Sequence, residues 1–113
     1  GTALAVHLGR TDHEVRLWAR DAATVADMQR RRANVVYLPD VLLPESVHPT
    51  ASLADAVSDT ELVVVAVPSH GCRAVMRGAA PHLASGAVLV SATKGLEVDS
   101  LLRMSEVIAQ ESD

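Results

Sequence analysis

The chain has little aromatic character and almost no cysteine: its 113 residues include no Phe, one Trp, one Tyr and one Cys. Hydrophobic residues still make up 49% of the chain, so any core must be built from aliphatic side chains. The single cysteine, Cys72, excludes an internal disulfide framework and a metal site made of several cysteines. Because its neighbours on an expected helix are apolar, we expect Cys72 to be an inert core residue.

Long apolar runs and an excess of basic residues are also missing. No apolar run approaches the ~20 residues that span a bilayer, and no signal peptide is recognisable. The formal net charge is -4, whereas a nucleic-acid partner would require a basic face. The sequence therefore predicts one domain in a cytoplasmic protein, without integral membrane association, a nucleic-acid partner or a metal site.

Two runs of β-branched and aliphatic residues, at 62–67 and 87–92, are the most informative feature that is present. Neither run alternates apolar with polar residues, so each is predicted as a strand buried on both faces, which is typical of a parallel sheet covered by helices. Ligands of such sheets bind beyond the carboxyl ends of the strands. Ser69, His70 and Lys94 follow these ends, which indicates an α/β sheet of the nucleotide-binding type.

Helical and strand patterns alternate along the rest of the chain. We expect helices at 2–9, 22–32, 53–57, 69–83 and 100–111, and a third strand at 14–19. This alternation implies right-handed crossovers and a doubly wound, mostly parallel sheet.

Turn and capping residues support these boundaries. Asp12 suits a left-handed turn, and Asp21 and Ser52 stand at helix N-caps. The segment 34–49 contains three prolines, which we expect to exclude a long helix or a central strand there.

The chain opens and closes on helical patterns without their packing partners. We therefore expect residues 1–113 to be a partial domain that lacks sequence on both sides, including a first strand.

Gly1 and Arg20 are candidate cofactor-binding residues. Gly1 would be the third glycine of a Gly-x-Gly-x-x-Gly loop, which lets the first helix pack closely on the first strand. Arg20 ends the strand at which dinucleotide folds meet the adenosine ribose, where an acidic residue selects NAD and an arginine accommodates the 2′-phosphate of NADP. The alternative for Arg20 is a solvated side chain beside a helix cap.

Pro68, Ser69 and His70 form the turn after the strand at 62–67. Ser69 and the start of the helix could donate hydrogen bonds to cofactor ribose or phosphate, or Ser69 could be an ordinary N-cap. His70 could be a general acid or base, but no carboxylate partner is visible, which favours a structural role.

Lys94 is the strongest chemical candidate. Between Thr93 and Gly95, after a buried strand, its ammonium should be partly desolvated, where it can bind a phosphate or carbonyl oxygen and stabilise negative charge. The alternative is a lysine that caps strand carbonyls.

The basic run at 30–32 is expected to be solvated, because it lies at a helix C-terminus.

Several motifs in one order and spacing resemble the amino-terminal domain of bacterial NAD(P)-dependent glycerol-3-phosphate dehydrogenase. The Tyr-Leu-Pro and Ala-Thr-Lys-Gly elements are the most specific of them. The resemblance covers essentially the whole chain and rests on residues 1–5, 13–18, Asn34, 37–39, 43–44, 67–70, 91–97 and 102–107.

The resemblance implies a Rossmann-type domain that binds NADP or NAD, with NADPH favoured by Arg20. It implies interconversion of sn-glycerol 3-phosphate and dihydroxyacetone phosphate by hydride transfer, mainly in the reductive direction that supplies phospholipid synthesis. Gly1, Arg20, Pro68 and Ser69 would line the cofactor groove, and Lys94 would lie near nicotinamide and substrate as the catalytic residue of this chain.

In this family a helical carboxyl-terminal domain supplies the acid/base lysine and most of the substrate-phosphate pocket, so residues 1–113 alone are expected to be inactive. A homodimer is one option for the full-length protein. Two other classes stay open: a related reductase, such as ketopantoate reductase or a hydroxyacid dehydrogenase, and a non-catalytic module that senses dinucleotides.

Overall fold

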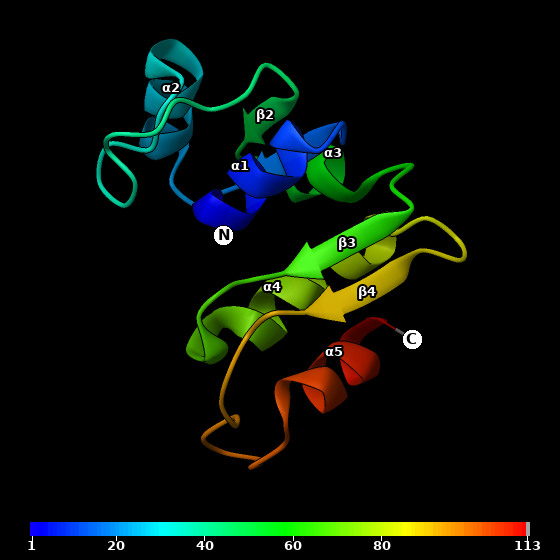
Figure 1. Ribbon diagram of the computed structural model, residues 1–113. Helices are drawn as coiled ribbons and strands as arrows, with labels where there is room; N and C mark the ends of the chain where they lie inside the picture. Colours follow the sequence, from blue (N-terminus) through cyan, green and yellow to red (C-terminus); the bar gives the residue numbers. More distant parts are fainter. Residues whose placement is uncertain (113) are drawn as a thin grey trace. The chain divides into compact units, whose positions relative to one another are not determined.

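The computed structural model describes residues 1–112, which alternate between helices and strands (Figure 1). The chain divides into two compact units, Gly1–Ala56 and Val57–Asp113, and each is described by itself. Among the described residues, no helix combines the length and the apolar character needed to cross a membrane.

The first unit pairs two short parallel strands and packs helices against them. Its elements are α1 (Thr2–Arg10), β1 (Val15–Trp18), α2 (Ala22–Arg31), β2 (Val47–Thr50) and the start of α3 (Leu53–Val57). In the β1–β2 register Val15 lies opposite Val47, and Trp18 lies opposite Thr50. The helices expected at 2–9, 22–32 and 53–57 and the strand at 14–19 are confirmed to within two residues.

The local signals for these elements act as expected. Asp21 caps α2 by accepting hydrogen bonds from the amide of Ala23 at 3.2 Å and the hydroxyl of Thr24 at 2.7 Å. The Ser52 hydroxyl accepts from the amide of Asp55 at 3.1 Å, which caps α3. Asp12 has φ 65°, the left-handed conformation predicted for that turn.

The three prolines were expected to exclude a long helix or a central strand from 34–49, and β2 does not contradict this. It includes Pro49 opposite Leu17, but among the described residues it pairs only with β1 and is therefore not a central strand. Amides of β1 donate to the carbonyls of Ser46, at 2.8 Å, and Thr50, at 3.1 Å. Along a strand, the backbone N–H and C=O groups of successive residues point to opposite edges. The backbone groups of the even-numbered residues Ser46 and Thr50 face β1, so those of Pro49 face away from it. The missing N–H of Pro49 therefore costs no hydrogen bond to β1.

An aliphatic core joins α1, α2 and β2, as the scarcity of aromatic residues required. Val25 and Met28, three residues apart in sequence, are the buried residues of α2 and belong to this core. The buried members of this core are Ala5, Val6, Val25, Met28, Leu43 and Val47.

Gly9 allows α1 to approach β2 closely, which leads to a testable expectation. A Cβ at position 9 would lie 2.7 Å from Cγ2 of Val47, a fully buried side chain, and 3.0 Å from the hydroxyl of Ser46. Replacing a helical glycine by alanine gains about 1 kcal/mol, whereas overpacking costs about 1–3 kcal/mol. We expect Gly9→Ala to lower the free energy of unfolding by about 1 kcal/mol in a urea titration.

Gly78→Ala is the matched control, because Gly78 is an exposed residue of helix α4 (Cys72–Ala79). There the helix-propensity gain should dominate and stabilise the protein. Equal stabilisation by both substitutions would show that α1 can shift away from Val47 at no cost.

The second unit contains a second parallel pair, β3 (Leu62–Val65) and β4 (Val88–Ser91), with α4 and α5 (Met104–Ser112) beside it (Figure 1). Leu62 lies opposite Val88 and Val65 opposite Ser91. Short 3₁₀ turns, Ser69–Gly71 and Ala80–His82, flank α4. The buried core of this unit consists of Val65, Cys72, Met76, Met104, Val107 and Ile108.

The prediction that β3 and β4 are buried on both faces was wrong. Val63, Val65 and Leu89 pack into the core formed with α4 and α5. On the opposite face, Val88 and Val90 are 58% and 43% exposed. Helices α4 and α5 cover only one face of the β3–β4 pair. The continuous apolar runs of these strands therefore do not mean that both faces are covered.

Two predicted helices begin later than expected. The helix predicted from Ser69 starts with a 3₁₀ turn, and its α-helical part begins at Cys72. The helix predicted from Ser100 begins at Met104 because a tight turn precedes it, in which Leu101 has φ 59° and its amide donates to the carbonyl of Glu97 at 2.8 Å.

Candidate functional site

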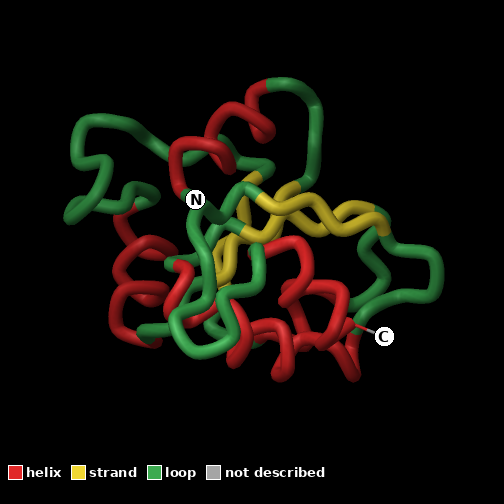
Figure 2. The backbone as a smooth tube through the Cα atoms, turned by 90° about the horizontal axis from the view of Figure 1, so that it is seen from below, coloured by secondary structure: helices red, strands yellow, loops and turns green. Residues whose placement is uncertain are grey.

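Most of the candidate residues follow strands: Arg20 follows β1, Pro68 and Ser69 follow β3, and Lys94 follows β4, whereas Gly1 precedes α1. Figure 2 shows the loops and turns between the helices and strands in green. Pro68, Ser69 and Lys94 belong to the second unit, and Gly1 and Arg20 to the first.

Thr93 ties together the segments that leave β3 and β4. Its hydroxyl donates to the carbonyl of Val65 at 3.1 Å and accepts from the amide of Val67 at 3.2 Å. The amide of Ala92 donates to the same Val65 carbonyl at 2.8 Å. One side chain thus fixes where the loop that carries Lys94 begins.

Lys94 is exposed, so the prediction of partial desolvation was wrong. The strand before it has only one covered face, and the turn carries the side chain beyond the end of β4. Lys94 is the only lysine of the chain. Within residues 1–112 its ammonium makes no hydrogen bond or ion pair, so it is available to an anionic ligand.

Gly95 follows Lys94 with φ 104°, a conformation that glycine adopts without strain. A Cβ at this position would lie 3.6 Å from the hydroxyl oxygen of Ser69. The turn after β3 and the turn after β4 therefore meet at Ser69 and Gly95, which brings two of the predicted site segments together.

Ser69 does not act as the ordinary N-cap that the sequence allowed. The N-cap positions of the 3₁₀ turn and of α4 are occupied by Pro68 and Gly71, and not by Ser69. Ser69 is half-buried within the 3₁₀ turn, and His70 beside it is exposed. The Ser69 hydroxyl therefore caps neither the 3₁₀ turn nor α4.

An ion-pair network behind the Lys94 turn was not anticipated from the sequence. Arg73, on α4, donates from Nε and Nη2 to the two carboxylate oxygens of Glu97 at 2.7 and 2.8 Å. Its Nη1 donates to Glu111 of α5 at 2.6 Å, and Nη2 also donates to Gln110 at 2.9 Å. Arg73 lies 24 residues from Glu97 and 38 from Glu111, so no local pattern could have paired them.

The network shifts the acidity of its members. Hydrogen bonds from Arg73, and then from Ser100, lower the pKa of Glu97 from 4.5 to about 2. Hydrogen bonds from Arg77 and Arg73 lower the pKa of Glu111. Both carboxylates are therefore ionised at neutral pH.

We expect the Glu97 contribution to stability to disappear in acid. A carboxyl whose pKa is lower in the folded state stabilises the protein fully above its unfolded pKa, near 4.5, and loses this contribution as the pH falls through about 2. In urea titrations, the stability difference between the wild-type protein and Glu97→Gln should be constant from neutral pH to about 5, and should shrink below that. A difference that does not change between pH 5 and pH 2 would contradict the ion pair.

In the first unit, Gly1 is the N-cap of α1, and its carbonyl accepts the first helical hydrogen bond from Ala5 at 3.0 Å. Arg20 is exposed directly after β1, and within residues 1–112 its guanidinium has no hydrogen-bond or ion-pair partner. The neighbouring Asp21 carboxylate is engaged by the cap of α2, and those hydrogen bonds, from Thr24 first, lower its pKa. Arg20 is thus free to meet an anion.

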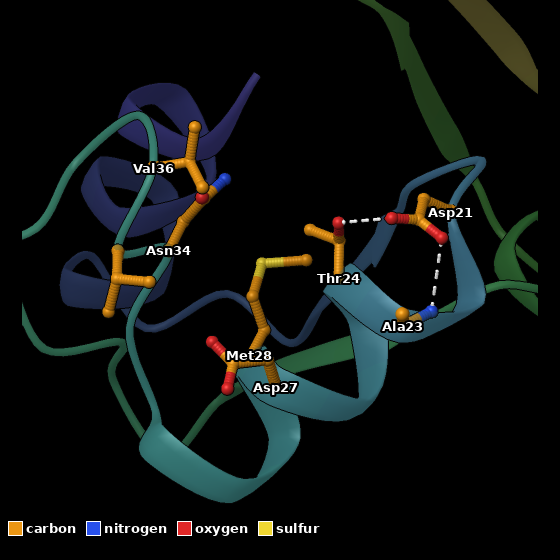
Figure 3. Close-up of a pocket in the computed structure, with 8 residues that line it drawn as sticks. Asp21, Ala23, Thr24, Asp27, Met28, Asn34 and Val36 are labelled. Carbon is orange, nitrogen blue, oxygen red and sulfur yellow. Dashed lines mark hydrogen bonds between the residues drawn. The ribbon is translucent and has the colours of Figure 1, made fainter.

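A hollow of about 220 Å³ lies beside this cap. Figure 3 shows the side chains that line it. Met28 contributes an apolar surface, and Thr24 and Asn34 contribute polar groups. Asn34 is itself buried, and its amide donates to the hydroxyl of Thr2 at 3.0 Å. The hollow is lined by Asp21, Ala23, Thr24, Asp27, Met28, Asn34, Val35 and Val36.

The basic run at the end of α2 is only partly solvated, contrary to expectation. Arg30 and Arg31 pair with Asp27 at 2.7 and 2.9 Å and remain exposed. Arg32 has φ 56° and turns inward, where it donates to the carbonyls of Pro44 and Val47 at 2.7 and 2.8 Å. It stabilises the segment that leads into β2, because these carbonyls gain a charged donor.

The predicted core position of Cys72 is confirmed. Its side chain is fully buried in the core of the second unit, and burial raises the pKa of its thiol. Within residues 1–112, no group of three or more potential metal ligands is arranged to hold a metal ion.

These features define a class. Two parallel strand pairs, with polar and cationic residues just beyond their carboxyl ends, are the arrangement of a nucleotide-binding α/β domain of the Rossmann type. The crystal structure of glycerol-3-phosphate dehydrogenase from Coxiella burnetii matches 98% of this chain with a TM-score of 0.91 and 32% sequence identity. A Plasmodium falciparum glycerol-3-phosphate dehydrogenase structure, at 23% identity, shares the fold with a TM-score of 0.81 over 94% of the chain.

The family model described as the N-terminus of NAD-dependent glycerol-3-phosphate dehydrogenase matches residues 1–113, and the chain belongs to this family. It is 46% identical over 111 residues to a glycerol-3-phosphate dehydrogenase [NAD(P)+] of Koribacter versatilis, and 42% identical over 108 residues to that of Bacillus subtilis. These matches cover 97% and 96% of this chain, but 33% and 31% of the two relatives. The chain therefore spans about a third of the length of the relatives it matches.

Proposed function

We propose that the full-length protein containing this chain interconverts sn-glycerol 3-phosphate and dihydroxyacetone phosphate with NAD(P)H. The observation that carries the proposal is Lys94: in a chain of this family it is an exposed, unpaired cation at the carboxyl end of a parallel strand, on a turn fixed by Thr93. An ammonium there suits both an anionic substrate and the negative charge that develops on a carbonyl oxygen during reduction.

The residues present fit a dinucleotide cofactor. Arg20 offers an unpaired guanidinium at the end of β1, beside a hollow with apolar and polar walls. This favours NADPH, because guanidinium recognises a phosphate monoester better than a neutral hydroxyl. Gly1, Pro68 and Ser69 complete the proposed cofactor-binding set. When bound, the nicotinamide supplies the hydride.

The chain's own contribution is to bind and to stabilise charge. Lys94 holds the oxygen of the reacting carbonyl or a substrate phosphate oxygen, and Thr93 and Glu97 hold the turn from which it projects. In this proposal, the acid/base lysine that the family resemblance places outside residues 1–113 transfers the proton to the developing alkoxide. As part of the proposal, the protein is cytoplasmic, the full-length form is a homodimer, and the reductive direction supplies phospholipid synthesis.

The test follows NADPH oxidation by the purified full-length protein with dihydroxyacetone phosphate, and compares ketopantoate as substrate. Turnover with dihydroxyacetone phosphate alone supports the proposal. Turnover with ketopantoate alone would assign a different reductase. A folded protein that binds NADPH but turns over neither substrate would indicate a sensing module.

A further inference from the structure

The turn that carries Lys94 is fixed at both of its ends. Before it, the Thr93 hydroxyl bridges the Val65 carbonyl and the Val67 amide. After it, the amide of Glu97 donates to the carbonyl of Leu102 at 2.9 Å and closes the following loop. The segment 94–96 between Thr93 and Glu97 is exposed, so its position is set by the hydrogen bonds at these two residues.

The second fixed end depends on Arg73. Both carboxylate oxygens of Glu97 accept from Arg73 in the parallel, two-bond arrangement that planar guanidinium favours. The Arg73 and Glu97 side chains are 27% and 20% exposed, so solvent screens this pair less than a surface pair. Because Arg73 also donates to Glu111, the guanidinium is held from α5 and cannot simply follow a moving Glu97.

Arg77, one turn further along α4, provides an internal comparison. It pairs with Glu111 at 3.1 Å, and its side chain is 69% exposed. No hydrogen bond or ion pair between Arg77 and Glu97 is present among the residues described. Two arginines on one helix thus share a partner in α5, but only Arg73 contacts the Lys94 loop.

We infer that Arg73 is a positioning residue that sets the place of the Lys94 ammonium by holding Glu97 at the far end of the turn. This inference rests on the proposed function, since it assigns Arg73 a role in the same reaction. Arg73 is not a catalytic residue, because it acts on the reacting atoms only through the turn.

The experiment measures kcat/KM for dihydroxyacetone phosphate at saturating NADPH in the full-length protein, with a double-mutant cycle between Arg73 and Lys94. We expect Arg73→Met to lower kcat/KM roughly tenfold, since small misplacements of a catalytic group cost up to about 100-fold. In the Lys94→Ala background the same substitution should cost less than about twofold, because the group it positions is gone.

Two further variants make the test specific. Arg73→Lys keeps the charge but cannot form the two-bond arrangement, so it should recover only part of the activity and should fold where Arg73→Met does not. Arg77→Gln is the matched control: it removes an arginine from the same helix without touching Glu97, and should leave kcat/KM unchanged.

The outcomes separate the inference from the proposed function. An active wild-type protein in which both Arg73 variants match the wild type, or in which substitution costs the same with and without Lys94, would overturn the positioning role and leave the proposed function intact. A folded wild-type protein without turnover would overturn the proposed function itself, and the inference with it.

Discussion

Lys94→Ala should abolish most of the turnover of the full-length protein. The ammonium of Lys94 is unpaired and exposed at the end of β4, so its removal deletes the positive charge that this turn offers to substrate. Removing one preorganised donor to a developing oxyanion typically costs about 10²–10³ in kcat. We expect a loss of this size in kcat/KM for dihydroxyacetone phosphate, measured by NADPH oxidation.

Lys94→Arg is the informative comparison for that experiment. Arginine keeps the charge but places it on a longer, planar group, so it should retain more activity than alanine and less than lysine. The dissociation constant for NADPH, measured by fluorescence titration, should change little in both variants if Lys94 acts mainly on substrate. A Lys94→Ala protein with wild-type kcat/KM would remove Lys94 from the catalytic machinery.

Arg20→Ala should weaken NADPH binding and spare NADH. A hydrogen bond from a guanidinium to a phosphate contributes about 1.5–3 kcal/mol, which corresponds to roughly a 10- to 150-fold rise in the KM for NADPH. The KM for NADH should change little, because NADH offers a neutral hydroxyl at the same place. The result would reverse or erase any preference for NADPH.

Arg30→Ala is the control for Arg20. Arg30 is also an exposed arginine of the first unit, but it pairs with Asp27 within α2. Its removal changes the net charge by the same amount and should not discriminate between the cofactors. If Arg20→Ala raised both KM values equally, Arg20 would contribute general electrostatic attraction and no recognition of the 2′-phosphate.

The order of helices and strands could be predicted well from the sequence, because the residues that cap helices and form turns act locally. The caps at Asp21 and Ser52 and the left-handed turn at Asp12 involve hydrogen bonds and backbone preferences within a few residues. The positions of Pro68, Ser69 and Lys94 after strands likewise follow from the boundaries of two apolar runs.

What could not be predicted depends on contacts between distant segments. Pro49 is compatible with β2 only because the register with β1 turns it away from that strand, and register is not a local property. From the sequence, Arg32 is expected to be a solvated residue at a helix end. In the structure it donates to the carbonyls of Pro44 and Val47, which are distant in sequence. The roles of the predicted site residues remain predictions, which the variants above test.

The core position of Cys72 makes its thiol a probe of local opening in the second unit. Its thiol is fully buried between α4 and α5, immediately before Arg73, and it is the only cysteine among these residues. Because the thiol is fully buried, a thiol reagent reaches it only in molecules whose core has opened locally, so the labelling rate in native buffer reports that opening. Opening of the core next to Arg73, which holds Glu97, can thus be measured without any substrate, from the labelling of one sulfur atom.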